Sequence, residues 1–222
     1  ILFTSRPVGD AMATTIWGAS SSWTLTALPL FVWMGEILFR TKLSENLFEG
    51  LAPWLQKLPG GLIHVNVVGC ALFAAISGSS AATVATVGKM SIPELRKRKY
   101  PEKILLGSLA GSGTLGLLIP PSIILIIYGV TVQESIAKLF IAGIIPGIMI
   151  AMIFMGYVII WSLLNKNKMP LTEENYSFLN KLIKSKQLIP VILLILGVIG
   201  SIYTGIATAT EAASLGVVGA LI

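Results

Sequence analysis

Two long apolar runs, each interrupted by small polar residues, dominate the pattern of this chain. Residues 62–88 and 104–130 contain no Asp, Glu, Lys or Arg, and each run is long enough to lie in a bilayer. The first has Ile-Ser-Gly-Ser-Ser-Ala at residues 76–81, and the second has Gly-Thr-Leu-Gly-Leu-Leu-Ile-Pro-Pro-Ser at residues 113–122. Glycine costs backbone entropy in a helix, and serine hydroxyls compete for backbone hydrogen bonds. We therefore expect both runs to break, which is tolerated at membrane depth only inside protein or beside a water-filled cavity.

The charges around the first run predict a re-entrant helical hairpin. Arg40, Lys42 and Lys57 precede it, and five lysines and arginines follow it between residues 91 and 103. By the positive-inside rule both flanks are cytoplasmic, whereas a single span would put them on opposite sides. Each arm would hold roughly 13 residues and rise about 20 Å, which places residues 77–80 near the middle of the membrane.

The second run is predicted to be a discontinuous helix. Its adjacent prolines, Pro120 and Pro121, remove two backbone donors and push the preceding residue out of the α region. Two half-helices joined by an unwound segment around residues 114–121 are the expected result. The alternative is a proline-kinked helix whose small residues pack against neighbours. A kink alone does not need four glycines just upstream, so the break is preferred.

The first 61 residues predict a membrane helix followed by an amphipathic helix. Residues 23–39 form a plausible span, near whose end Glu36 and Arg40 are four apart and face the same side. An ion pair at a helix end is favoured over an intramembrane coupling acid at Glu36. Residues 41–61 carry leucines at helical spacing with charges between them, which predicts a helix along the membrane interface.

The remainder of the chain predicts further membrane helices. Gln133 and Glu134 are expected in an external loop, and residues 139–165 form a span without charge. A polar cytoplasmic loop at 166–186 and a span at 187–206 should follow, and residues 204–213 begin another segment of small residues. The predicted regions are a scaffold-like part (1–61), a transport-type part with hairpin and broken helix (62–136), and further helices (137–222). We expect the chain to be part of a longer protein, truncated at its C-terminus.

Composition supports an all-α, polytopic transmembrane bundle. Of 222 residues, 55% are hydrophobic and 12% charged, and the mean hydropathy is +0.85, which excludes an ordinary soluble domain. The net charge of +6 would suggest nucleic acid in a soluble chain, but here the positive residues cluster between apolar runs, so no nucleic-acid partner is expected. Cys70 and His64 are each the sole residue of their type; Cys70 is predicted to be buried and His64 to be packed or interfacial. No enzyme, cofactor or ATP-binding motif is indicated.

The two breaks suit a small cation and an anionic substrate. Exposed carbonyls and Ser or Thr hydroxyls are hard oxygen ligands, and half-helix N-termini favour a carboxylate. A pair of interrupted hydrophobic segments is also the best sequence indication of a transporter's binding site. The hairpin tip and the break at 114–121 could together hold Na⁺ as the coupling ion and face the substrate. Neutral ligands fit, because an acidic cage would repel the substrate and release the cation poorly.

At these residues the chain resembles a known family. Residues 76–88, from Ile-Ser-Gly-Ser-Ser-Ala to Val-Gly, are similar to the first hairpin of the large membrane subunit of TRAP transporters (tripartite ATP-independent periplasmic transporters). Residues 113–122 resemble that subunit's first discontinuous helix. Residues 204–213 also match a family segment, although Ala209 stands where the family usually carries proline. The resemblance covers essentially the whole chain, and the motifs are specific in combination.

The resemblance implies an elevator-type, sodium-driven transporter of the bacterial inner membrane. It implies uptake of an organic acid, of the C4-dicarboxylate or sialic acid type, with a periplasmic substrate-binding protein and a small membrane subunit as partners. Carried over to this chain, the first Na⁺ site would use the tip and backbone oxygens of the break: Ser77, Ser80, Gly113, Thr114, Gly116 and Ile119. The residues expected to face the substrate are Ser79, Thr83, Pro120 and Pro121. A second hairpin and second Na⁺ site belong to an inverted repeat that lies outside this chain.

Two alternatives remain open at this stage. A Na⁺/organic-anion symporter of the same architecture would work without a binding protein. A channel or a non-transporting scaffold would also carry apolar spans, but it would not accumulate substrate against a gradient.

Overall fold

The structure is a computed structural model that describes residues 7–41, 43–170 and 177–221, so Lys42 of the predicted cytoplasmic flank lies outside it. The described residues form helices and turns without any strand, which confirms the all-α prediction. The N-terminal half contains seven α-helices and two short 3-10 helices: α1 (Val8–Ser20), η1 (Trp23–Thr26), α2 (Ala27–Arg40), α3 (Leu43–Leu55), α4 (Ile63–Ser77), α5 (Ser80–Lys97), α6 (Glu102–Gly113), η2 (Thr114–Leu117) and α7 (Ile123–Val132).

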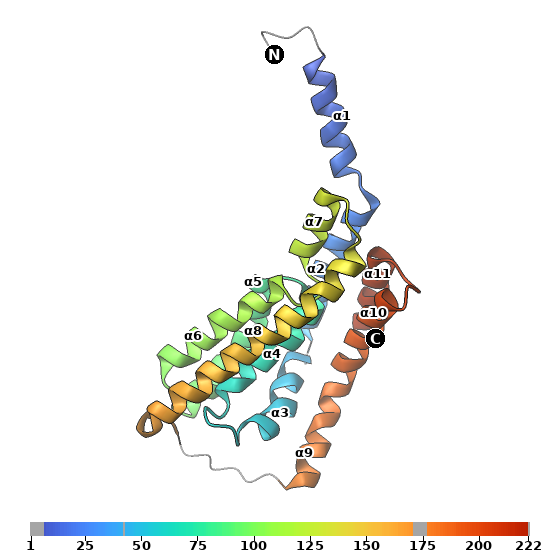
Figure 1. Cartoon of the computed structure of the whole chain (residues 1–222). Helices are drawn as coiled ribbons and strands as arrows, with labels where there is room; N and C mark the ends of the chain where they lie inside the picture. Colours follow the sequence, from blue (N-terminus) through green and yellow to red (C-terminus); the bar gives the residue numbers. More distant parts are fainter. Residues whose placement is uncertain (1–6, 42, 171–176, 222) are drawn as a thin grey trace.

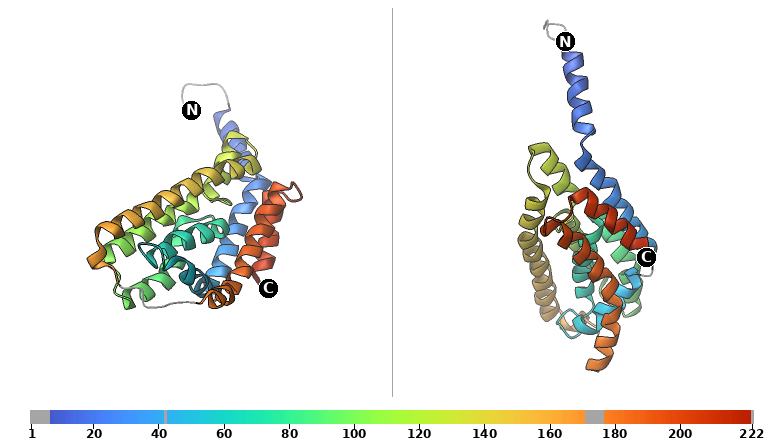
Figure 2. Two further views of the ribbon diagram at one scale, coloured as in Figure 1. Left: turned by 60° about the horizontal axis from the view of Figure 1, so that its bottom comes forward. Right: turned by 90° about the vertical axis from the view of Figure 1, so that its right-hand side faces the viewer.

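The described part of the C-terminal half contains one long α-helix, three shorter α-helices and two 3-10 helices. These are α8 (Ile136–Leu164), η3 (Lys166–Lys168), α9 (Phe178–Ser185), η4 (Lys186–Leu188), α10 (Ile189–Tyr203) and α11 (Ala209–Leu221). In Figure 1, α8 runs beside α4 and α6, while α10 and α11 lie on the other side of the molecule and α1 projects away from the bundle. The right-hand view of Figure 2 shows the same projection of α1.

Membrane-spanning capacity is concentrated in the C-terminal half. By length and composition, Ile136–Leu164 and Phe178–Tyr203 can each cross a membrane, and α1 with η1 and α2 would add a third span if that bent pair is one crossing. Helix α4 has 15 residues and α7 has 10. At 1.5 Å per residue these rise roughly 22 and 15 Å, less than the apolar thickness of about 30 Å. Neither helix can cross alone, as expected for a hairpin arm and a half-helix.

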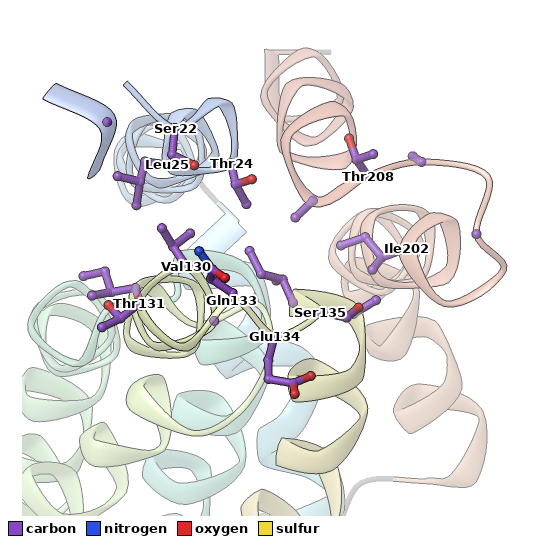
Figure 3. A pocket seen from close by; sticks show the side chains of 18 of the residues that line it. Ser22, Thr24, Leu25, Val130, Thr131, Gln133, Glu134, Ser135, Ile202 and Thr208 are labelled. Carbon is purple, nitrogen blue, oxygen red and sulfur yellow. Dashed lines mark hydrogen bonds between the residues drawn. The ribbon is translucent and has the colours of Figure 1, made fainter. Parts of the chain in front are cut away.

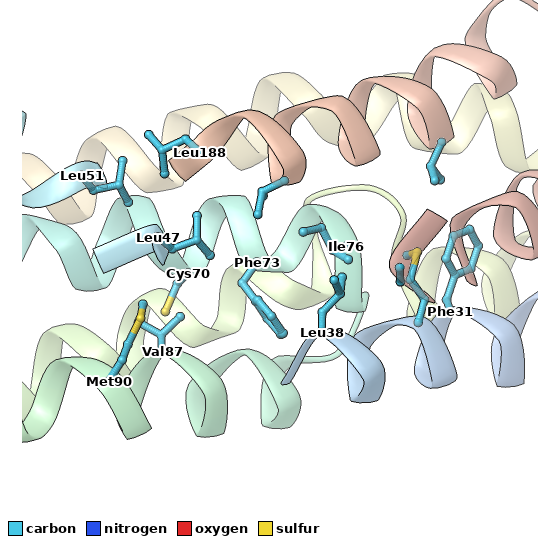
Figure 4. Close-up of a cluster of buried hydrophobic side chains, with 14 of the residues drawn as sticks. Phe31, Leu38, Leu47, Leu51, Cys70, Phe73, Ile76, Val87, Met90 and Leu188 are labelled. Carbon is cyan, nitrogen blue, oxygen red and sulfur yellow. The ribbon is translucent and has the colours of Figure 1, made fainter. Parts of the chain in front are cut away.

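The hairpin arm α4 forms the centre of the packed core. Nearly all of its residues are buried, so helices α2, α3, α5, α6 and α8 surround it. Figure 4 shows Cys70, Phe73 and Ile76 of α4 among side chains from several helices, with Val87 of α5 beside them. Cys70 is buried with a free thiol, as predicted. Because lipid is as apolar as these side chains, close packing rather than exclusion of water stabilises such contacts.

Two distant parts of the sequence pack along α2 and α3. Helix α11 lies against α2, with Gly216 directly beside the Met34 side chain. Helix α9 and η4 cover α3, where the Trp54 indole donates a hydrogen bond to the Ser185 hydroxyl (2.8 Å) and Leu188 fills the space above Gly50. The predicted amphipathic helix is therefore present.

Two loop predictions need correction. Residues 166–186 were expected to be a polar loop, but their described C-terminal part forms α9, in which Leu179, Leu182 and Ile183 recur at helical spacing between lysines. The hairpin's second arm was expected to end near Gly88, but α5 continues to Lys97. Its amphipathic end still finds partners on α3 and α6, which explains why the helix continues into charged sequence.

The base of the hairpin is fixed by Tyr100, in the turn between α5 and α6. Its hydroxyl accepts a hydrogen bond from the backbone N–H of Leu62 (3.0 Å) and lies against Gly61. Burial raises the pKa of the Tyr100 phenol. His64 is fully buried, with Nε2 2.8 Å from the Pro59 carbonyl oxygen, so it takes the packed one of the two positions expected for it.

Candidate functional site

The hairpin turns at Gly78, in the middle of the Ser-Gly-Ser-Ser sequence. Gly78 ends α4 with φ +60° and ψ 7°, a left-handed conformation that glycine adopts without the steric cost of a Cβ. Ser79 is extended and caps α5, because its hydroxyl accepts a hydrogen bond from the N–H of Ala82 (3.4 Å). The first apolar run is therefore two helices joined by a two-residue turn, which confirms the predicted break.

The tip is held by a cluster of hydroxyls. The Ser77 Oγ lies 3.0 Å from the Thr83 Oγ1 and 3.3 Å from the Ser79 carbonyl oxygen. The Thr83 hydroxyl donates to that same carbonyl at 2.7 Å. Ser77 and Thr83 are buried, whereas Ser80 is half-buried and its hydroxyl has no hydrogen-bond partner within the described part of the chain. Ser80 thus presents an unused oxygen at the tip.

The second run breaks where the prolines predict. Helix α6 ends at Gly113, the chain continues as the 3-10 helix η2 through Leu117, and α7 begins at Ile123. The Ser122 hydroxyl donates to the Leu117 carbonyl oxygen at 2.6 Å and so spans the gap. The peptide bond between Pro120 and Pro121 is cis. The interpretation as two half-helices is confirmed over that of a kinked helix.

The structure brings the hairpin tip and the break into direct contact. The N–H of Ile123, at the start of α7, donates to the Gly78 carbonyl oxygen at 3.2 Å. A methyl group on Gly116 would lie 2.8 Å from the Ser80 nitrogen and 2.9 Å from the Ser79 carbonyl carbon and oxygen, so only glycine permits this approach. A methyl group on Gly78 would in turn lie 2.7 Å from the Pro121 oxygen. Backbone therefore meets backbone at this junction.

Four helix ends surround the junction. The C-terminal ends of α4 and of α6 with η2 present carbonyl groups, and the N-terminal ends of α5 and α7 present N–H groups. Partial negative charge at the first pair favours a cation, and partial positive charge at the second favours an anion. Both apolar runs lack charged side chains, so these backbone dipoles and the hydroxyls set the local electrostatics.

The predicted site residues divide into two groups. Residues of the tip and the near side of the break meet at the junction: Ser77, Ser79, Ser80, Thr83, Gly113, Gly116 and Pro121. The Thr114 hydroxyl is exposed and donates to the Gly111 carbonyl (2.7 Å), so only its backbone is available. The side chains of Ile119 and Pro120 turn toward Gly147 and Gly143 of α8. Thr83, expected to face the substrate, is fully buried in the hydroxyl cluster in this conformation.

Several contacting residues were not among the predicted site residues. Gly35 of α2 packs on Ser77, because a methyl group there would lie 3.0 Å from the Ser77 Cβ. Asn66, Ser108 and Ser112 form a buried polar seam (defined here as these three residues) between α4 and α6. A polar residue inside each apolar run, at helical spacing from the break, is the sequence signal that would have found the seam.

A separate cavity of about 1140 Å³ lies at one end of the molecule (Figure 3). Its lining comes from α1, η1, the turn between α7 and α8, and the connection from α10 to α11, and includes Thr24, Gln133, Glu134 and Thr208. No residue of the tip or of the 113–122 segment lines it. Gln133 and Glu134 form the turn that the sequence predicts to be external, so the cavity lies on that side of the molecule.

Fold and site together define a helical membrane protein in which two interrupted apolar segments meet at a neutral, oxygen-rich junction. The family model described as "Tripartite ATP-independent periplasmic transporter, DctM component" matches residues 1–222. The chain is 35% identical over 218 residues to a C4-dicarboxylate TRAP transporter large permease protein of Pseudomonas aeruginosa, covering 98% of this chain and 50% of the relative.

Two further relatives carry other substrates in their names. An isethionate TRAP transporter permease protein of Oleidesulfovibrio alaskensis is 36% identical over 95% of this chain and 33% of its own length. A sialic acid TRAP transporter permease protein of Haemophilus influenzae is 36% identical over 86% of this chain and 31% of its own length. The chain belongs to the DctM family of TRAP transporter large permease proteins, a transport family rather than an enzyme family. It spans between about a third and a half of the relatives it matches.

Proposed function

We propose that this chain is the first half of a large permease subunit that couples Na⁺ entry to uptake of an organic acid. The observation that carries the proposal is the backbone contact between hairpin tip and break, at whose edge the Ser80 hydroxyl has no hydrogen-bond partner among the described residues. Ser77, Ser80 and backbone oxygens of Gly113, Thr114, Gly116 and Ile119 would provide the Na⁺ ligands. Such neutral oxygen ligands suit a small hard cation that must also be released.

The anionic substrate would bind next to the ion, at the N-terminal ends of α5 and α7. Ser79, Pro120 and Pro121 lie at or beside these ends, and the partial positive charge there favours a carboxylate. Thr83 would reach substrate only after the hydroxyl cluster rearranges. The relatives' names include dicarboxylate, sialic acid, isethionate and ectoine, so they select no single substrate. The first three are acids and support an organic acid.

The whole transporter would reside in the bacterial inner membrane and work by an elevator-type movement. Family membership supports two partners, a small membrane subunit and a periplasmic substrate-binding protein. The cavity beside Glu134 lies on the side predicted to be external, and its lining is separate from the junction. The proposed movement carries the junction between the two sides of the membrane while it stays assembled.

The test is the sodium dependence of thermal stability in the purified full-length large permease with its partner subunit. NaCl should raise the melting temperature relative to equal concentrations of KCl, because a bound ion stabilises the folded state. Ser80→Ala should raise the NaCl concentration needed for half of that shift by roughly tenfold. Ser80 is the sharpest choice because the described chain gives its hydroxyl no other partner to lose.

Ser91→Ala is the matched control, since Ser91 is a buried serine on the same helix α5 whose hydroxyl also lacks a partner in the described chain. Sodium dependence should be unchanged in this variant. Equal sodium dependence in the parent protein, Ser77→Ala and Ser80→Ala would refute the assigned ligands. Uptake of labelled C4-dicarboxylate and sialic acid into liposomes, with and without the periplasmic protein, then tests the coupling. Uptake that continues without that protein would instead support the binding-protein-independent symporter.

A further inference from the structure

The polar seam between α4 and α6 lies outside the proposed ligand set and has an unusual hydrogen-bond pattern. The Asn66 side-chain nitrogen donates to the Leu105 carbonyl at 3.1 Å and to the Ser108 hydroxyl at 3.0 Å. The Ser112 hydroxyl donates to the Ser108 carbonyl at 2.6 Å and lies 3.4 Å from the Asn66 carbonyl oxygen. Asn66 and Ser112 are completely buried. These bonds join the first hairpin arm to the first half of the broken helix.

The seam contributes little to the net stability of the fold. The Asn66 Oδ1 is buried and has no hydrogen-bond partner in the described chain. A buried acceptor without a partner loses its solvation, which offsets much of what the two donated bonds contribute. An apolar side chain of similar size would avoid that cost. The amide is better explained by a requirement for a particular alignment of the two helices.

Between the Tyr100 hydrogen bond at the base and the junction at the tip, the alignment of α4 against α6 is otherwise weakly specified. Helix α4 is apolar on almost every side, and the buried residues Leu105 and Leu109 of α6 are apolar as well. Apolar pairs of this kind tolerate a shift in register, whereas a buried amide must meet its own donors and acceptors. A shift of one residue would move α6 by about 1.5 Å along its axis.

Such a shift would directly change the contact between the backbones at the junction. Ser112 immediately precedes Gly113, where α6 ends, and Gly116 lies one turn further on against the Ser79–Ser80 backbone. The contact at Gly116 leaves no room for even one methyl group. A displacement of α6 along its axis would therefore either separate the two backbones or make them clash. Asn66 precedes Ser77 by eleven residues, so it lies about 16 Å from the tip along α4. A change of alignment at the seam would reach the junction through the two helices.

We infer that Asn66, held by Ser108 and Ser112, is a positioning residue that sets the register of α4 against α6 and thereby the geometry of the tip against the break. This inference rests on the proposed function, because the geometry it controls is that of the proposed Na⁺ site. It also requires α4 and α6 to move as one rigid unit during transport. Asn66 itself binds neither ion nor substrate.

The first test replaces Asn66 in the full-length permease and follows the sodium-dependent melting temperature. Asn66→Leu should raise the NaCl concentration for half of the shift roughly tenfold, while the melting temperature without sodium changes little. Asn66→Gln retains the donor on a longer side chain and should fall between Asn66→Leu and the parent protein. Ser91→Ala, which leaves the seam intact, should match the parent protein. Unchanged sodium dependence in Asn66→Leu would overturn the inference. A fall in the sodium-free melting temperature of Asn66→Leu that is large enough to explain the whole change in its sodium response would also overturn it.

Ser80→Ala in the same assay separates the two proposals. A weaker sodium response in Ser80→Ala but not in Asn66→Leu keeps the proposed Na⁺ site and rejects the positioning role. An unchanged response in both variants rejects the site and the positioning role together.

The second test uses the native Cys70, the single cysteine of this chain, whose thiol contacts the Ser112 hydroxyl. Ser112→Cys places a second thiol beside it, in a full-length protein whose other cysteines are replaced. The reduced Ser112→Cys protein is the reference, because the substitution itself changes the seam. Oxidation should then crosslink α4 to α6. Sodium-dependent stabilisation and uptake that survive crosslinking support one rigid unit. Loss on oxidation with recovery on reduction would show that the helices slide past each other and would overturn the inference.

Discussion

Helix α8 and the two broken segments all contain small residues within long apolar sequences, yet α8 is continuous and the other two break. The uncharged run that begins at residue 139 has Gly143, Pro146 and Gly147 near its start. Helix α8 nevertheless continues through them and is 29 residues long. The first apolar run, with Ser-Gly-Ser-Ser at its centre, reverses direction at Gly78. Glycine and proline therefore do not by themselves decide whether a membrane segment breaks.

The difference lies in what the small residues contact. Gly143 and Gly147 are four apart on one face of α8, where they receive the Leu118 carbonyl and the Ile119 side chain of the broken segment. They make room for a neighbour while α8 keeps its helical backbone, apart from the one hydrogen bond that Pro146 cannot donate. Gly78 and Gly116 instead allow two backbones that have left helical geometry to approach each other. Small residues in α8 thus support the break from outside, and those at the junction form it.

The largest effect is expected for Gly116→Ala. The added methyl group would lie 2.8–2.9 Å from backbone atoms of Ser79 and Ser80, which cannot move aside as a flexible side chain can. Sodium-dependent stabilisation and uptake by the full-length protein should be lost almost completely. Gly107→Ala, in α6 with no atom within 4 Å of the added methyl group, should leave both unchanged. Normal uptake by Gly116→Ala would show that the junction is not closed during transport.

An intermediate effect is expected for Gly147→Ala in α8. Its methyl group would lie 2.8 Å from the Ile119 Cγ1, a side-chain atom that can shift. The free energy of unfolding should fall by about 1 kcal/mol, since overpacking outweighs the gain in helix propensity. Gly156→Ala, in an open position of α8, should be neutral or slightly stabilising when chemical denaturation is compared. If Gly147→Ala abolishes sodium binding as Gly116→Ala does, the distinction between the two kinds of glycine is wrong.

The smallest effect is expected for Glu36→Gln in α2. The Glu36 carboxylate pairs with the Arg40 guanidinium at 2.7 Å, and both side chains are substantially exposed, at 49% and 77%. The structure therefore agrees with an ion pair near a helix end. Its loss should cost at most about 0.5 kcal/mol and leave sodium-dependent uptake intact. If a folded Glu36→Gln variant lost uptake, Glu36 would be a coupling acid. The mechanism would then require a charged carboxylate as well as the neutral oxygen ligands.

Much of the fold followed from local sequence rules. The proline pair, the Ser-Gly-Ser-Ser centre and the positive flanks predict the broken helix and the hairpin, because each acts through backbone geometry or charge near its own position. The helix α9 was missed because lysines between its leucines suggested a loop, and only packing against Trp54 and Gly50 of α3 shows why the segment is ordered. The exposed Thr114 hydroxyl and the buried Thr83 likewise depend on how helices face each other.

By itself, the sequence determined that two membrane segments break and where they do so, since glycine, serine and proline act on the backbone within a turn of their own positions. Only the tertiary structure decided that the breaks meet, that Gly116 lies on the Ser79–Ser80 backbone and that Asn66 links α4 to α6. Those contacts join residues that are more than 30 positions apart, and their geometry depends on the packing of helices that are apolar on nearly every side. Periodicity cannot orient such helices, because it offers no polar face to distinguish one side from another.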